Sequence, residues 1–143
     1  MSNYNLDTLY RQVIMDHYKH PRNKGTFSED ESLTVEMNNP TCGDRIFLQF
    51  KLNGDIVEDI KFTGEGCSIS LASASMMTQA VKGKKIDEAL QLSELFSKMM
   101  VGEEVDIEDF DNDDIEALQG VSNFPARIKC ATLAWKAMEK VSK

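Results

Sequence analysis

The chain has 143 residues and a net charge of −8, with 41% hydrophobic and 28% charged residues, which suits one domain with a sizeable core. No apolar run is long enough to span a membrane, and the N-terminus lacks the basic and apolar regions of a signal peptide, so we expect a cytoplasmic protein. The acidic balance without a basic stripe argues against nucleic-acid binding.

The first predicted element is an amphipathic helix over about residues 6–19. Apolar side chains recur there at helical spacing, and Pro21 follows as a helix stop. His17 lies near the apolar stripe of this helix. We interpret it as a hydrogen-bonded helix histidine in preference to a metal ligand.

Three strands are predicted next, over residues 33–38, 45–52 and 56–62, because apolar and polar residues alternate there. Asn53-Gly54-Asp55 is typical of a hairpin turn between the second and third strands. We place Ile56 on the same face as Ile60 and Phe62, and we expect Gly64 to break the third strand. The pattern predicts an α+β fold, in which helices cover one face of a three-stranded antiparallel sheet.

The second half of the chain is predicted to be helical. We expect a helix over residues 68–82, two or three short helices with an acidic connector over about 84–120, and a last helix that begins at Pro125 and continues through Trp135. Nine acidic residues and no basic residue lie between positions 103 and 116, whereas the rest of the chain is almost balanced in charge. This segment should form a solvated surface lobe, held by a few apolar side chains: Ile107, Phe110, Ile115 and Leu118.

The chain has three cysteines, an odd number that excludes a complete disulfide framework. Cys42 is in a predicted turn, Cys67 is at a predicted helix N-terminus, and Cys130 follows two cations, so each context favours or exposes a thiolate. Asp44 is close enough in sequence to Cys42 to present an oxygen to the same point. Three thiolates and one carboxylate would suit zinc or cluster iron, while buried, inert cysteines are the alternative.

The sequence resembles the IscU/NifU-type iron–sulfur cluster assembly family over nearly its whole length. The resemblance is carried by three stretches: Asn39-Pro40-Thr41-Cys42-Gly43-Asp44, Gly64-Glu65-Gly66-Cys67-Ser68-Ile69-Ser70 and Pro125-Ala126-Arg127-Ile128-Lys129-Cys130. It implies a two-layer sandwich of one domain, residues 1–143. It also implies that four residues gather at one exposed end of that domain and bind the metal: Cys42, Asp44, Cys67 and Cys130.

Two departures from typical IscU scaffolds make the chain similar to the SufU branch of this family. Lys129 stands where those scaffolds carry histidine before the third cysteine, and residues of about 84–120 include an inserted helical, acidic segment. A protonated lysine has no lone pair for a metal, so the histidine's role cannot be transferred to Lys129. For the SufU branch, the resemblance implies a firmly held Zn²⁺, a cysteine desulfurase as sulfur donor and a downstream iron–sulfur assembly complex.

Three functions remain open at this stage. The first is a zinc-dependent sulfurtransferase in which Cys42 accepts persulfide sulfur, while Arg127 and Lys129 offset part of the negative charge of the site. The second is a scaffold on which a [2Fe–2S] cluster is assembled and transferred. The third is a structural zinc module that recruits partners. The lysine at position 129 favours the first, because a persistent zinc site needs no exchangeable histidine.

Overall fold

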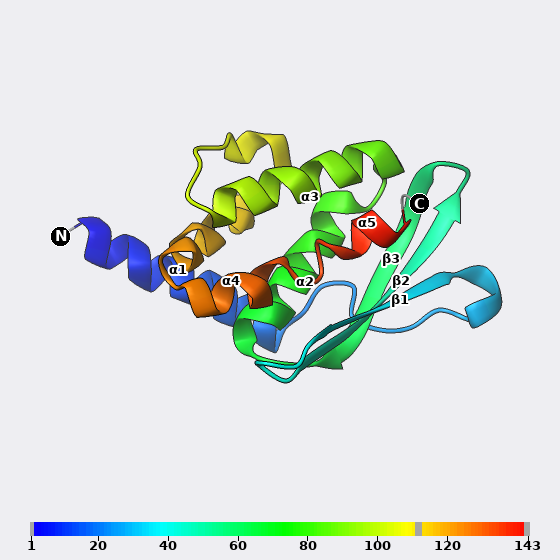
Figure 1. The fold of residues 1–143 in the computed structure, drawn as a ribbon, viewed down its shortest axis with the longest axis horizontal. Helices are drawn as coiled ribbons and strands as arrows, with labels where there is room; N and C mark the ends of the chain where they lie inside the picture. Colours follow the sequence, from blue (N-terminus) through cyan, green and yellow to red (C-terminus); the bar gives the residue numbers. More distant parts are fainter. Residues whose placement is uncertain (1, 111–112, 142–143) are drawn as a thin grey trace.

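The computed structural model describes residues 2–110 and 113–141. It shows a three-stranded sheet packed against helices (Figure 1). The predicted α+β class is confirmed. The helices are α1 (Ser2–Lys19), α2 (Ser68–Val81), α3 (Ile86–Met100), α4 (Pro125–Thr132) and α5 (Ala137–Val141), and the strands are β1 (Leu33–Asn39), β2 (Asp44–Asn53) and β3 (Ile56–Glu65). The described residues also form three 3₁₀ segments: η1 (Glu29–Glu31), η2 (Ile107–Phe110) and η3 (Asp113–Asn123).

The sheet is an antiparallel meander in the order β1-β2-β3. Alternate side chains of β2, namely Ile46, Leu48 and Phe50, are fully buried. They form the core together with α2, whose small side chains let the helix lie close to its neighbours. Burial of one sheet face against helices is the arrangement that the alternating pattern predicts.

A β-bulge changes the face that the start of β3 turns to the core. Lys51 pairs with Asp59, but its neighbour Leu52 pairs with Val57, so one extra residue of β3 lies between the two pairs. The extra residue reverses the alternation of side chains. Val57 is therefore fully buried, whereas Ile56 is 38% exposed. Our prediction that Ile56 shares the inner face with the later apolar residues of the strand is wrong for this reason.

The third strand continues beyond its predicted end, through Gly64 to Glu65. Gly64 pairs with Ile46 and has a φ of +136°, a backbone conformation that glycine adopts without strain. A Cβ atom at this position would lie 2.1 Å from the carbonyl oxygen of Arg45. The glycine therefore allows close approach of the two strands instead of ending the ladder, and it brings the chain to Cys67 beside the start of β2.

The predicted last helix is interrupted between Thr132 and Ala137. Trp135 is fully buried at this break and stacks on Phe96, with ring centroids 4.5 Å apart. Its carbonyl oxygen accepts hydrogen bonds from the Ser93 hydroxyl at 2.8 Å and from the N–H of Met138 at 3.1 Å. The second of these bonds spans three residues, so the chain tightens into 3₁₀-type turns around the buried indole.

His17 is fully buried, and both ring nitrogens have partners. Nδ1 lies 2.8 Å from the Ser75 hydroxyl, and Nε2 lies 2.8 Å from a carboxylate oxygen of Asp114. The interpretation of this residue as a hydrogen-bonded helix histidine is thus confirmed. The contact also attaches the acidic segment of residues 103–116 to α1 and α2.

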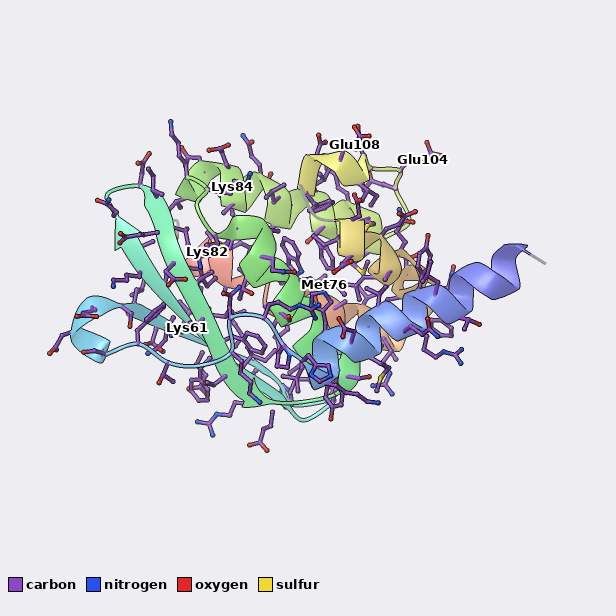
Figure 2. All side chains as sticks on the ribbon, turned by 180° about the vertical axis from the view of Figure 1, so that it is seen from behind. Lys61, Met76, Lys82, Lys84, Glu104 and Glu108 are labelled. Atoms are coloured by element: carbon purple, nitrogen blue, oxygen red, sulfur yellow. The ribbon has the colours of Figure 1, made fainter. Side chains whose placement is uncertain are left out.

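The acidic segment is held as predicted by apolar anchors, and several of its described carboxylates face outward. Phe110, Ile115 and Leu118 are fully buried, while Ile107 packs partly buried against the core. Glu104 and Glu108 are exposed and point away from the body of the protein (Figure 2). None of the helices in the described part of the chain combines the length and apolar character needed to cross a membrane.

Candidate metal centre

The first candidate ligands lie at the end of the β1–β2 hairpin. Asn39 and Asp44 form the last cross-strand pair, and the turn between them carries Cys42. The N–H of Cys42 donates to the carbonyl oxygen of Asn39 at 3.2 Å, and Gly43 has a φ of +71°. The turn therefore presents Cys42, which is half-buried, next to the buried carboxylate of Asp44.

Cys67 is the N-cap residue of α2. Its sulfur accepts a hydrogen bond from the N–H of Ser70 at 3.4 Å, which satisfies one of the free donors at the helix start. The N–H of Cys67 itself donates to Asp44 Oδ1 at 3.0 Å. The start of α2 is thereby joined to the start of β2, as the predicted grouping of these two residues requires.

Cys130 is fully buried on α4, and its sulfur lies near the Cys42 sulfur and the Asp44 carboxylate. The ligand atoms of Cys42, Asp44 and Cys130 all lie within 4.8 Å of one another, and this is the only such group among the described residues. Three of the four predicted ligands are therefore brought together. The sulfur of Cys67 lies outside this group and is turned toward Ser70, although its backbone is bound to Asp44.

Three residues that support the site were not singled out in the sequence. The Ser70 hydroxyl lies 3.0 Å from Asp44 Oδ1, and the amide of Asn39 lies 3.4 Å from Asp44 Oδ2. A Cβ atom on Gly66 would lie 2.5 Å from Asp44 Oδ1, so the backbone passes directly over the carboxylate. All three lie inside the motif stretches, and the spacing of Ser70 from Cys67 is the usual capping interval, which is the one signal that could have identified a supporting residue.

Burial raises the pKa of the Cys130 thiol, and hydrogen bonds with Cys42 and Asp44 add to this effect. Arg127 is exposed on α4, three residues before Cys130 and hence on the same helix face. The thiols raise the pKa of the Arg127 guanidinium, with Cys130 as the main cause. Lys129 is also exposed, but neighbouring helix positions point about 100° apart, so its side chain leaves the helix in another direction.

The donor set fits zinc. Thiolate sulfur and carboxylate oxygen are ordinary zinc ligands, and zinc sites take four ligands in a tetrahedron. Cys42, Asp44 and Cys130 supply three donors, and the half-buried Cys67 beside them is a further thiol. A site with so many sulfur atoms is unsuited to magnesium or calcium, which prefer oxygen.

At one end, the sheet-and-helix sandwich brings together two cysteines and a buried aspartate, a group that could hold a metal ion. The family model for the NifU-like N-terminal domain matches residues 9–131, and the chain belongs to this family. The assignment made from the sequence motifs is confirmed. Membership of this family supports a function in iron–sulfur cluster assembly.

Two relatives with named functions indicate the branch of the family to which the chain is most similar. It is 72% identical over 138 residues to the zinc-dependent sulfurtransferase SufU of Bacillus subtilis (strain 168), covering 96% of this chain and 92% of that protein. It is 48% identical over 138 residues to the iron–sulfur cluster assembly scaffold protein IscU of Streptococcus pyogenes serotype M1, covering 96% and 85%. These similarities confirm the resemblance to the SufU branch.

Solved structures agree with this placement. A putative iron–sulfur cluster assembly scaffold protein for the SUF system from Fervidobacterium islandicum AW-1 superposes with a TM-score of 0.81 at 36% identity, covering 90% of this chain and 92% of that one. A hypothetical protein gives a TM-score of 0.85 at 46% identity, covering 96% and 99%. The fold of this chain is therefore an IscU/SufU-type fold.

Proposed function

We propose that this chain is a sulfurtransferase of iron–sulfur cluster assembly that takes sulfur from a persulfide on a cysteine desulfurase. In this proposal Cys42, Asp44, Cys67 and Cys130 hold one Zn²⁺. High identity to a relative named as a zinc-dependent sulfurtransferase supports the proposal, and so does the donor set. The observation that carries it is the close group of two thiols and a buried carboxylate at one end of the fold.

The reaction is an exchange at sulfur. The Cys42 thiolate attacks the outer sulfur of the donor persulfide, a bond forms between these two sulfurs, and the sulfur–sulfur bond of the donor breaks. The donor cysteine leaves as a thiolate, and Cys42 becomes the persulfide. No oxidant is needed, because sulfane sulfur is only moved from one thiol to another.

Cys42 is the proposed first acceptor because it is more exposed than Cys130 and, unlike Cys67, is not attached to a helix. It is half-buried on a glycine-containing turn, whereas Cys130 is fully buried in α4 and Cys67 caps α2. Zinc, when bound, would keep the thiols deprotonated and tie the hairpin to the two helices. Arg127 and Lys129 would offset negative charge beside the thiols, with Arg127 on the same helix face as Cys130.

The remaining parts of the proposal concern organisation and partners. We propose that residues 1–143 form a single IscU/SufU-like domain in which about 84–120 is an insertion. The protein would act in the cytoplasm, between a cysteine desulfurase and the downstream iron–sulfur assembly complex. A [2Fe–2S] scaffold is the second candidate, favoured because the relative from Streptococcus pyogenes is named as an assembly scaffold. A structural zinc module for partner recruitment is the third.

The test combines metal analysis with mapping of the persulfide. The purified protein should contain about one zinc ion and little iron. After reaction with a desulfurase and cysteine, mass spectrometry should locate the extra sulfur on Cys42. Sulfur on Cys67 or Cys130 while Cys42 is intact would contradict the proposed acceptor. A stable [2Fe–2S] cluster that is passed to an acceptor protein would favour the scaffold, and cysteine variants that act only through unfolding would favour the structural module.

A further inference from the structure

We propose that Asn39 is a positioning residue of the metal centre, which holds Asp44 and Cys130 together while it leaves the Cys42 thiol free to move. This inference rests on the proposed function, since it concerns the residues proposed to bind zinc. Asn39 is the last residue of β1 and is only 6% exposed. It does not belong to the predicted ligand set.

One residue contacts three of the four proposed ligands. The side-chain amide nitrogen of Asn39 lies 3.4 Å from Asp44 Oδ2 and 3.6 Å from the sulfur of Cys130. The backbone carbonyl oxygen of Asn39 accepts the N–H of Cys42 at 3.2 Å. Asn39 thereby connects the turn, the start of β2 and the middle of α4, and its contact with Cys130 spans 91 positions of the chain.

The chemistry of its neighbours determines the orientation of the amide. An ionised carboxylate can only accept hydrogen bonds, so the NH₂ group of Asn39, and not its oxygen, must face Asp44. The same nitrogen carries a second N–H, which can donate to the Cys130 sulfur. A hydrogen bond to a charged acceptor is stronger than one between neutral groups, so this bridge gains strength when the ligands are ionised by a bound metal.

Asn39 contacts some ligands through their side chains and one through its backbone, so the ligand side chains differ in how freely they can rotate. Asn39 contacts Asp44 and Cys130 through side-chain atoms of those residues, whereas it contacts Cys42 only through the backbone N–H of that residue. The Cys42 sulfur can therefore rotate about its side-chain bonds, as sulfur transfer requires, without breaking a bond to Asn39. Groups that orient metal ligands in this way typically contribute about 10–100-fold to metal affinity.

The experiment compares Asn39→Ala with its neighbour Asn38→Ala. Asn38 is exposed on the same strand and its amide bonds only Glu36 among the side chains described, so it is a matched control. Zinc affinity is measured by competition with a chromophoric chelator. The second readout is the sulfur-to-metal charge-transfer band of the Co²⁺-substituted protein. Asn39→Leu is made in parallel, because leucine fills a similar volume without an N–H.

Both Asn39 variants should bind zinc about 10–100-fold more weakly than Asn38→Ala. Their Co²⁺ charge-transfer band should move to lower energy, because a sulfur that loses a hydrogen bond gives up its electrons more easily. A merely structural role would not move that band. Unchanged affinity and an unchanged band in either folded variant would overturn the proposal, and so would failure of both variants to fold with zinc present, since Asn39 would then be structural. A parent protein that binds no zinc would contradict the proposed function itself.

Discussion

The backbone N–H of Cys67 donates a hydrogen bond of 3.0 Å to Asp44 Oδ1, and this bond joins the start of α2 to the start of β2. Asp44 is 2% exposed, and the Ser70 hydroxyl and the Asn39 amide also lie within hydrogen-bonding distance of its carboxylate. A buried charge is stable only with such partners. Asp44 therefore has a structural role before any metal binds, in addition to its proposed role as a ligand.

The first prediction follows from this double role. Asp44→Ala should destabilise the metal-free protein by about 1–3 kcal/mol, because the Cys67 N–H loses its buried acceptor. The same variant should also bind zinc more weakly than the parent protein. Asp55→Ala, at an exposed hairpin position, is the control and should change neither quantity. Denaturant unfolding with and without zinc measures both effects, and equal stability of Asp44→Ala and Asp55→Ala would refute the structural role.

The second prediction concerns the glycine above the carboxylate. A Cβ atom on Gly66 would lie 2.5 Å from Asp44 Oδ1 and 2.6 Å from the Ser70 hydroxyl, closer than real Cβ contacts allow. Gly66→Ala should displace the carboxylate and weaken zinc binding. Gly120→Ala meets no atom within 4 Å and is the matched control. Chelator competition measures the zinc affinity of the two variants. Equal affinities would contradict the prediction and show that the carboxylate tolerates the shift.

The third prediction is a dependence of stability on pH. Burial and the bonds to Cys42 and Asp44 raise the pKa of Cys130 in the folded, metal-free protein. The unfolded chain loses this proton near the usual thiol pKa of about 8.5, whereas the folded chain keeps it. The stabilisation is therefore fully present below that pH, and above it the free energy of unfolding should fall by up to about 1.4 kcal/mol per pH unit.

Unfolding titrations of the metal-free protein between neutral and alkaline pH measure this slope. Cys130→Ala is the control and should show a flatter dependence, since it removes the group that keeps its proton. The zinc affinity should show the opposite trend and rise with pH, because the thiols must lose their protons to bind the metal. A metal-free protein whose stability increases above the thiol pKa would contradict the assignment of this effect to Cys130.

The fourth prediction distinguishes exposed acidic residues of the segment 103–116 from the one that binds a buried histidine. Glu104 and Glu108 are exposed, so their replacement together by glutamine should change stability by no more than about 0.5 kcal/mol. Asp114→Ala removes the partner of Nε2 of the buried His17 and should cost about 1–3 kcal/mol. Thermal unfolding measures the difference. Zinc content should be the same in both proteins, and its loss in the double glutamine variant would contradict the surface role of the segment.

Local patterns in the sequence were sufficient to predict the three strands, the position of α2 and the anchors of the acidic segment. These features depend on the alternation or helical spacing of residues that are neighbours in the chain, so each stretch carries its own signal. The motif residues likewise identified the family, and through it predicted one site of Cys42, Asp44, Cys67 and Cys130. The ligand atoms of Cys42, Asp44 and Cys130 lie together, whereas the sulfur of Cys67 lies outside that group.

Other features were decided only by the tertiary structure. The bulge that buries Val57 in place of Ile56 depends on how two strands pair, and the break before Ala137 depends on the contact of Trp135 with Phe96 and Ser93. The position of Asn39 between Asp44 and Cys130 depends on a contact across 91 positions. Periodicity describes one segment at a time, whereas packing and buried hydrogen bonds are set by pairs of segments that meet only when the chain has folded.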